Sequence, residues 1–446
     1  MRGLLLSVVL MALLALAAAR PFVGVLVWSW ISFMNPHREA WGFVQSMPWA
    51  MIAFIITVFG CFVAREPKKL TTNALTTLII VFGVGITLTS LTALAPPSLV
   101  WAKWDRTIKM LMGLLLTAAL LTSRDRIHAL TWLIVISLGF YGVKGGIFTL
   151  MTGGGFQVVG PPDTMIADRN HAAVAMLFSI PLMNYLRLQS RHRLIQWGLA
   201  AAMMLTLVAT IGSQSRGALV GTLATGFVFW MRSRGKLLSG ISIVLALALL
   251  VAFMPESWVE RMNTIGEYRE DESAMGRVTI WRIALLLALR RPLVGGGFRA
   301  VYVQDVVDFI DPTITARATH SIWFEVLGEH GFVVFFVWLA MFAAGIVYSM
   351  QLVRMARGRS DLDWARDLGR MAQVSMVAYA VGGTFLSLAY WDGFWTLMVV
   401  LGAACAVARQ GAPERARTNL VRMSRQTEAA RQVAGSLGAA HGVAGR

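Results

Sequence analysis

Charged residues are scarce in this chain of 446 residues, where they make up 14% of the sequence against roughly 25% in ordinary soluble domains. Hydrophobic residues, in contrast, make up 57% of it. A composition so poor in charge is atypical of a water-soluble globular protein, and it is typical of a chain that crosses a membrane many times.

Cysteine is also nearly absent. Both cysteines, Cys61 and Cys405, fall inside apolar runs, where a small buried hydrophobic side chain is the usual role of this residue. The sequence therefore predicts no disulfide framework.

Long apolar runs are what the chain has in abundance. A helix needs about 20 mainly apolar residues to cross the hydrocarbon core of a bilayer, and several of the runs are short, so their predicted boundaries are approximate. The runs lie at residues 48–64, 74–94, 107–121, 127–150, 172–186, 194–211, 218–231, 237–254, 332–353, 371–390 and 394–408. We therefore predict an all-α polytopic membrane protein with about twelve transmembrane helices.

The first 34 residues are a special case. Residues 2–19 are similar to a signal peptide, with a positive start, an apolar middle and a run of small residues, but a second apolar stretch follows at once and favours an uncleaved anchor. Arg20 and Pro21 stand in the middle, so residues 4–34 form either one broken span or a short hairpin. Parity with the remaining spans favours a single crossing, with both termini in the cytoplasm.

The net charge of +17 comes from basic residues that gather in alternate connections between the apolar runs. They are Arg65, Lys68 and Lys69; Arg124 and Arg126; Arg187, Arg191 and Arg193; Arg232, Arg234 and Lys236; and Arg354, Arg357 and Arg359. Basic residues concentrate in the cytoplasmic connections of membrane proteins, so this pattern indicates an orientation and contact with membrane lipids, and it argues against nucleic-acid binding.

A long polar segment, residues 255–320, interrupts the spans on the opposite, periplasmic side. Its acidic residues roughly balance its arginines, which indicates a folded cap. Apolar residues at helical spacing over residues 277–289 predict a helix at the membrane interface, and Pro292 and the glycines at 295–297 end it. The chain thus divides into transmembrane helices 1–9 (1–254), a periplasmic cap loop (255–330), transmembrane helices 10–12 (331–408) and a basic cytoplasmic tail (409–446).

Polar clusters converge on the periplasmic side at residues 168–171, 213–217, 276–281 and 320–321. Three arginines in them, Arg216, Arg277 and Arg169, are candidate phosphate ligands, because a guanidinium fork matches two phosphate oxygens. The alternative for each is a membrane-surface anchor or a structural ion pair. Arg216 is the strongest candidate, because it stands in a very short external turn where the orientation rule requires no positive charge.

His320, at the end of the long loop, is the candidate general base, because a neutral imidazole accepts a hydroxyl proton near neutral pH. The alternative is a capping or interface histidine, and His171 and His330 are weaker candidates for the same role. The histidines lack the close spacing of a metal site. The glycine runs at 153–155 and 295–297 lack the Lys-Ser/Thr of a nucleotide loop, which favours turns or close packing.

At these residues the chain resembles the O-antigen ligase and O-antigen polymerase superfamily. The resemblance rests on Ser213-Gln214-Ser215-Arg216-Gly217, on Arg277 with Trp281, on residues 292–297, and on His320-Ser321 followed by Leu327, Glu329 and Gly331. Residues 28–37, which include Met34-Asn35-Pro36-His37, are similar to the putative O-glycosylation ligases found alongside exosortase systems.

The resemblance implies a GT-C-like enzyme of the bacterial inner membrane that moves a polysaccharide from an undecaprenyl diphosphate carrier to a hydroxyl of lipid A-core oligosaccharide. It implies inverting, metal-independent transfer without a cofactor, in which Arg216 and Arg277 hold the leaving diphosphate and His320 activates the acceptor. The only Asp-x-Asp pair, Asp361 and Asp363, falls on the cytoplasmic side. The alternatives are an O-antigen polymerase, a protein O-glycosylation ligase, or a flippase for lipid-linked sugars.

Overall fold

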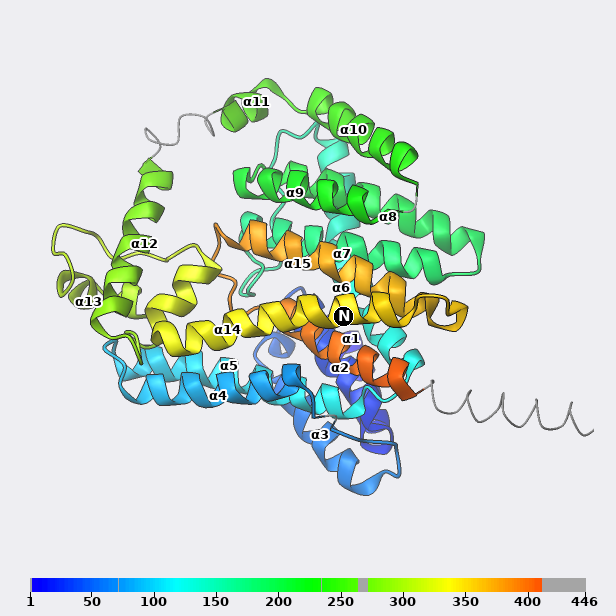
Figure 1. The fold of residues 1–446 in the computed structure, drawn as a ribbon, viewed down its shortest axis with the longest axis horizontal. Helices are drawn as coiled ribbons and strands as arrows, with labels where there is room; N and C mark the ends of the chain where they lie inside the picture. Colours follow the sequence, from blue (N-terminus) through cyan, green and yellow to red (C-terminus); the bar gives the residue numbers. More distant parts are fainter. Residues whose placement is uncertain (1, 71, 234, 264–271, 411–446) are drawn as a thin grey trace, which may run out of the picture.

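The computed structural model describes residues 2–70, 72–233, 235–263 and 272–410, and in these residues the fold is built from helices without a β-strand (Figure 1). The α-helices are α1 (Arg2–Ala19), α2 (Pro21–Met34), α3 (Trp49–Val63), α4 (Ala74–Leu91), α5 (Pro97–Leu120), α6 (Arg124–Met151), α7 (Arg169–Gln189), α8 (Arg193–Gly212), α9 (Arg216–Arg232), α10 (Lys236–Phe253), α11 (Glu256–Asn263), α12 (Glu272–Arg290), α13 (Gln304–Asp308), α14 (Ile322–Met355), α15 (Asp363–Gly383) and a last helix, Asp392–Gln410. Single 3₁₀ turns lie at Phe43–Gln45, Ala300–Tyr302 and Ser360–Leu362. The predicted basic tail lies outside the described residues.

Among the described helices, seven are long and apolar enough to cross a membrane: α1, α4, α6, α8, α10, α14 and Asp392–Gln410. Helices α2 and α3 are apolar but shorter. The helices fit the prediction of an all-α polytopic membrane protein, while the number of twelve spans stays a prediction.

Two predicted helix boundaries are corrected. Helix α5 begins at Pro97, ten residues before the predicted run, because proline is favoured at the first position of a helix. Helix α15 ends at Gly383, before the end of the run at residues 371–390. The residues that follow Gly383 form a turn against the start of α14, and this turn becomes important for the site.

The amino-terminal segment folds as two helices side by side, not as the single crossing that parity favoured. Gly3 packs on the backbone of Trp41, beyond the end of α2, and Gly60 of α3 packs on the carbonyls of Ala17 and Ala18 at the turn between α1 and α2. A straight helix over residues 2–34 would separate its ends by about 50 Å. Pro21 starts the second helix, since it lacks the N–H that would continue the first.

The connections between the helices sort into two ends. At one end the guanidinium of Arg126 lies 3.2 Å from the carboxylate of Glu66, and Gln189 donates to Asp367 over 3.0 Å. At the other end Arg169 donates to the carbonyl of Gln214 over 3.3 Å. The basic connections therefore lie at the first end, and the polar clusters that the sequence singled out lie at the second.

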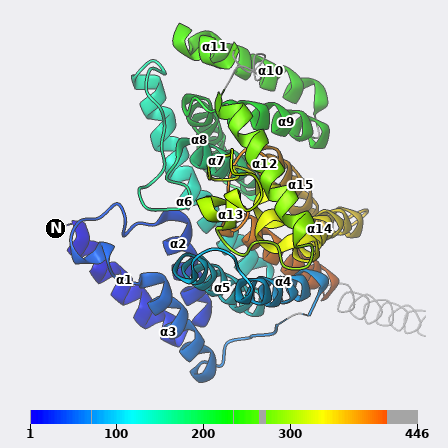
Figure 2. The same cartoon turned by 90° about the vertical axis from the view of Figure 1, so that its left-hand side faces the viewer.

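The cap has a small hydrophobic core of its own. Helix α12 contains the predicted interfacial helix, and it buries Ile280, Ile283 and Leu287 against Val301 and residues of α13. Helices α12 and α13 lie at the end of α14 that carries the polar clusters, and Figure 2 looks onto this end. Contact of α12 with a membrane interface stays a prediction.

The glycine run at 295–297 packs against a kink in α14, which confirms the close-packing interpretation. Gly331 interrupts α14 with φ 72° and ψ −173°, in the region that favours glycine. The backbone N–H of Gly296 donates to the carbonyl of Gly328 over 2.9 Å, and that of Gly297 donates to the carbonyl of Glu329 over 2.7 Å. A Cβ at position 295 would lie 2.5 Å from the nitrogen of Gly331, so only glycine fits there.

Candidate active site

The turn between α8 and α9 presents Arg216 at the first position of α9. Gln214 adopts a left-handed conformation with φ 53°, and the side chain of Ser215 caps α9 by accepting from the N–H of Ala218 over 3.2 Å. Serine is a preferred N-cap residue because its oxygen satisfies a helix N–H that has no other partner. The Ser-Gln-Ser-Arg-Gly sequence therefore encodes a tight turn that ends with an arginine at a helix start.

Helix α7 presents Arg169 in the same way. Asp168 caps the helix by accepting from the N–H of Asn170 over 2.8 Å, and it also lies 3.2 Å from Nδ1 of His171. The hydrogen bonds from His171 and Asn170 lower the pKa of Asp168, so this carboxylate stays charged. Arg169 then reaches across to the carbonyl of Gln214 and joins the two helix starts.

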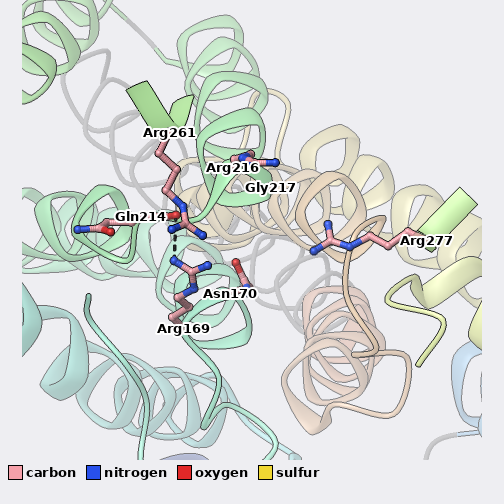
Figure 3. A pocket seen from close by; sticks show the side chains of 7 residues that line it. All are labelled: Arg169, Asn170, Gln214, Arg216, Gly217, Arg261 and Arg277. Atoms are coloured by element: carbon pink, nitrogen blue, oxygen red, sulfur yellow. Dashed lines mark hydrogen bonds between the residues drawn. The ribbon is translucent and has the colours of Figure 1, made fainter. Parts of the chain in front are cut away.

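Four arginines meet around one cavity of about 150 Å³. Its lining consists of Arg169, Asn170, Gln214, Arg216, Gly217, Arg261 and Arg277. Figure 3 shows the guanidinium groups of Arg169, Arg261 and Arg277 reaching in from different elements, with Arg216 behind them. The starts of α7 and α9 add the positive ends of two helix dipoles. Such a cavity suits a ligand with several anionic oxygens.

The structure thus brings together all three arginines that the sequence predicted, and it adds Arg261. This residue lies on α11, whose Trp258 and Met262 are buried; the indole of Trp258 donates to the carbonyl of Ile211 over 3.2 Å. Trp258, Arg261 and Met262 share one helix face, because residues three and four positions apart are neighbours on a helix. This spacing is the signal that could have identified Arg261 in the sequence.

His320 lies beside the cavity, close to Arg277. Its backbone is left-handed, with φ 44°, and its N–H donates to the hydroxyl of Ser387 over 3.0 Å. The preceding carbonyl, of Thr319, accepts from the indole of Trp281 over 2.7 Å. Trp281 and Arg277 are one turn apart on α12, so a single helix supplies both an anchor for the His320 backbone and a cation for the cavity.

The charge state of His320 suits a base. Burial lowers its pKa, and the positive charge of Arg277 lowers it further. The imidazole is therefore neutral at neutral pH and has a free lone pair to accept a proton.

His330 and His171 have different surroundings. His330 is fully buried, with Nδ1 2.6 Å from the hydroxyl of Thr89 and its ring edge-on to Phe298, so it is not part of the cavity. His171 is paired with Asp168 at the rim. In the part of the chain that the structure describes, His, Cys, Asp and Glu form no group of three or more that could hold a metal ion.

Glu329, which follows His320 in the sequence motif, and Glu325, one helical turn before it, form a buried ion-pair network with Lys103 of α5. Nζ of Lys103 lies 2.9 Å from an oxygen of each carboxylate. The hydroxyl of Tyr390 donates to Glu329 over 2.7 Å. We call these four residues the Lys103 cluster.

Comparison with family models identifies the region that holds most of these residues. Residues 200–339 match the model described as O-antigen ligase. We call residues 200–339 the O-antigen ligase domain, after the family model that they match. Residues 1–192 match a family of unknown function (DUF5935), and no curated protein matches the chain.

The match confirms the resemblance to the O-antigen ligase superfamily that the motifs indicated. The O-antigen ligase domain contains Arg216, Arg261, Arg277 and His320. Arg169 comes from the region of unknown function, so both matched regions contribute to the cavity.

Proposed function

We propose that this protein is an O-antigen ligase, which transfers a polysaccharide from undecaprenyl diphosphate to a hydroxyl of lipid A-core oligosaccharide. The observation that carries the proposal is the convergence of four arginines on one cavity next to a partly buried histidine, mostly within the O-antigen ligase domain. The diphosphate of the donor occupies the cavity, where the guanidinium groups bind its oxygens in pairs.

The chemistry is an inverting displacement at the sugar carbon attached to the diphosphate. His320 accepts the proton of the acceptor hydroxyl while the hydroxyl oxygen forms a bond to that carbon from the face opposite the diphosphate. The carbon–oxygen bond to the diphosphate breaks, and the leaving group takes the electron pair. The arginines stabilise the negative charge that develops there, and one well-placed donor of this kind is commonly worth about 2.7 to 4 kcal/mol.

The orientation of the chain supports a periplasmic site in the inner membrane. The cavity lies at the end of the helices opposite the basic connections, and such connections concentrate in the cytoplasm. Donor and acceptor are both membrane-bound, so a cavity at the membrane surface is accessible to each.

An O-antigen polymerase and a protein O-glycosylation ligase use the same kind of donor, and they differ from the proposed ligase in the acceptor. The deciding experiment incubates the purified protein with lipid-diphosphate glycan and, in separate reactions, lipid A-core, a second glycan donor, or an acceptor protein. Product with lipid A-core alone supports the ligase; product only with a second donor or an acceptor protein replaces it. Net movement of donor across vesicles without any product would favour a flippase.

The same assay tests whether the arginines take the place that a divalent cation has in many sugar transferases. We expect an undiminished rate in excess EDTA, because the guanidinium groups already stabilise the departing diphosphate. Loss of the product on chelation, and its return with magnesium or manganese, would contradict metal-independent transfer.

A further inference from the structure

The two glutamates of the Lys103 cluster lie on the first turns of α14, shortly after His320, and Lys103 contacts both of them inside the protein. The side chain of Glu325 is 4% exposed and that of Glu329 is 1% exposed, while Lys103 is 15% exposed and contacts both. A buried carboxylate keeps its charge only when it is paired and hydrogen-bonded. Lys103 donates to one oxygen of Glu325 and to both oxygens of Glu329, so it holds the two carboxylates in place beside the segment that follows α15.

The two glutamates hold the turn that follows α15, residues 384–390. One oxygen of Glu325 accepts from the N–H of Ala389 over 3.2 Å, and Glu329 accepts from the hydroxyl of Tyr390. At the other end of the turn, the hydroxyl of Thr384 accepts from the indole of Trp323 over 2.9 Å. The turn is thus joined to the first turns of α14 at both ends.

Ser387 stands in the middle of this turn, and it is the residue that accepts from the N–H of His320. Its hydroxyl also lies 3.4 Å from the hydroxyl of Thr319, the residue before His320. The left-handed backbone of His320 is strained for a residue other than glycine, and it persists only where neighbours hold it. The neighbours here are Trp281 on one side and Ser387 on the other.

We infer that Glu325, held in place by Lys103, is a positioning residue for His320: it fixes the 384–390 turn, and the turn fixes the histidine through Ser387. The inference rests on the proposed function in one respect, that His320 is the base. Glu325 and Lys103 do not enter the reaction, and their effect is on the placement of the imidazole relative to the cavity.

The test compares Glu325→Leu with Glu325→Gln. Leucine has a similar volume but accepts no hydrogen bond from Ala389, whereas glutamine keeps an acceptor oxygen there. A misplacement of about 1 Å at a reacting group costs about 100-fold in rate. We expect Glu325→Leu to lower kcat about 100-fold with little change in the donor KM, since the arginines are unaltered, and Glu325→Gln to retain most of the activity.

The matched control is Asp367→Leu. Asp367 is a carboxylate with a side chain 5% exposed, which accepts from Gln189 at the opposite end of α15. The Asp367→Leu substitution removes a similar buried hydrogen bond but leaves the contacts of the 384–390 turn unaltered. A fall in kcat for Glu325→Leu equal to that for Asp367→Leu would reduce the role of Glu325 to general stability and overturn the inference.

A second measurement does not depend on turnover. Diethyl pyrocarbonate modifies accessible imidazoles, and the modification of His320 is followed by mass spectrometry of the purified full-length protein. We expect faster modification of His320 in Glu325→Leu than in the unaltered protein, Glu325→Gln or Asp367→Leu; equal rates in all four would overturn the inference. If Glu325→Leu fails to fold, Ser387→Ala is used in its place, since it removes the acceptor next to His320 directly.

The two proposals fail in different ways. If His320→Ala transfers glycan at the unaltered rate, His320 is not the base and the mechanism falls, while the modification rates still decide whether Glu325 controls the placement of His320. If His320→Ala is inactive and the rates do not differ, the mechanism stands and the positioning inference falls.

Discussion

The arginine cavity and the Lys103 cluster both lie near the start of α14, yet they differ in how their positive charges are paired. The cavity gathers four guanidinium groups that are only partly buried. The cluster places one ammonium between two carboxylates, and both carboxylates are buried. The cavity suits an anionic ligand from solution, whereas the lysine of the cluster already has carboxylate partners inside the protein.

The difference follows from the chemistry of the two cations. Lysine is a compact point charge that can sit between two carboxylates, whereas arginine is a planar fork that suits pairs of phosphate oxygens. A buried ion pair gains little net stability, because removing its charges from water costs about as much as their attraction returns. Its more useful effect here is to fix one arrangement of α14 and the 384–390 turn. Four predictions separate the two regions.

The largest effect is expected at the junction of the two regions, in His320→Ala. Loss of a positioned base commonly costs about 10² to 10⁴-fold in rate. We expect transfer to fall by that factor or below detection, with the protein still folded and donor binding unchanged, because the arginines remain. Turnover is measured with purified protein, and donor binding by equilibrium titration. Turnover near that of the unaltered protein would exclude His320 as the base.

Lys103→Met tests the cluster. Removing one partner of a buried ion pair commonly costs about 3 to 5 kcal/mol, because the remaining charges stay buried without compensation. We expect a large loss of thermal stability in detergent. The control is Lys109→Met on the same helix: Lys109 pairs with Asp105, but the two side chains are 53% and 51% exposed, and such pairs contribute about 0 to 1 kcal/mol. Equal melting temperatures for the two variants would contradict a structural role for the cluster.

Arg216→Lys tests whether the cavity needs forks or only positive charge. We expect it to lose nearly as much activity as Arg216→Ala, about 10² to 10³-fold for each, because a point charge cannot bind two oxygens at once. Thermal stability should change little, unlike Lys103→Met. Arg232→Lys and Arg232→Ala, at the opposite end of α9, are the controls. Full activity in Arg216→Lys would favour simple charge neutralisation.

The smallest effect is a shift along the pH axis. Only neutral His320 accepts a proton, so kcat/KM should be constant near neutral pH and fall as pH drops through a pKa below 6.5, the ordinary value for histidine. Arg277→Gln removes the positive charge that lowers the pKa of His320, so this pKa should rise. The fall of kcat/KM on the acidic side of the pH profile should then occur at higher pH. A fall at an unchanged pH would place Arg277 too far from His320 for the proposed site.

The sequence predicted the parts of this structure that depend on local pattern. Apolar runs located most of the helices, and the alternation of basic connections placed Arg169, Arg216, Arg277 and His320 at one end of them. Arg261 was missed because its helix is short and lies in a loop whose charges nearly cancel. Its helical spacing with Trp258 was present but was not used.

The Lys103 cluster could not be predicted in the same way. Glu329 stood in a recognised motif, but Lys103, the partner of Glu325 and Glu329, lies more than 200 residues earlier, and no sequence period links them. The end of α15 at Gly383 depends on the same long-range contacts. The amino-terminal hairpin depends on how α1, α2 and α3 pack, and parity, which favoured a single crossing, does not account for this packing.

The boundary between the two matched families falls between residues 192 and 200, but the molecule does not divide there. The first region supplies Arg169 to the cavity and Lys103 to Glu325 and Glu329. An O-antigen ligase domain cut out at residue 200 would leave two buried carboxylates without their cation and a cavity without one wall. Chimaeras that exchange specificity between relatives should therefore exchange Arg169 and Lys103 together with the later half.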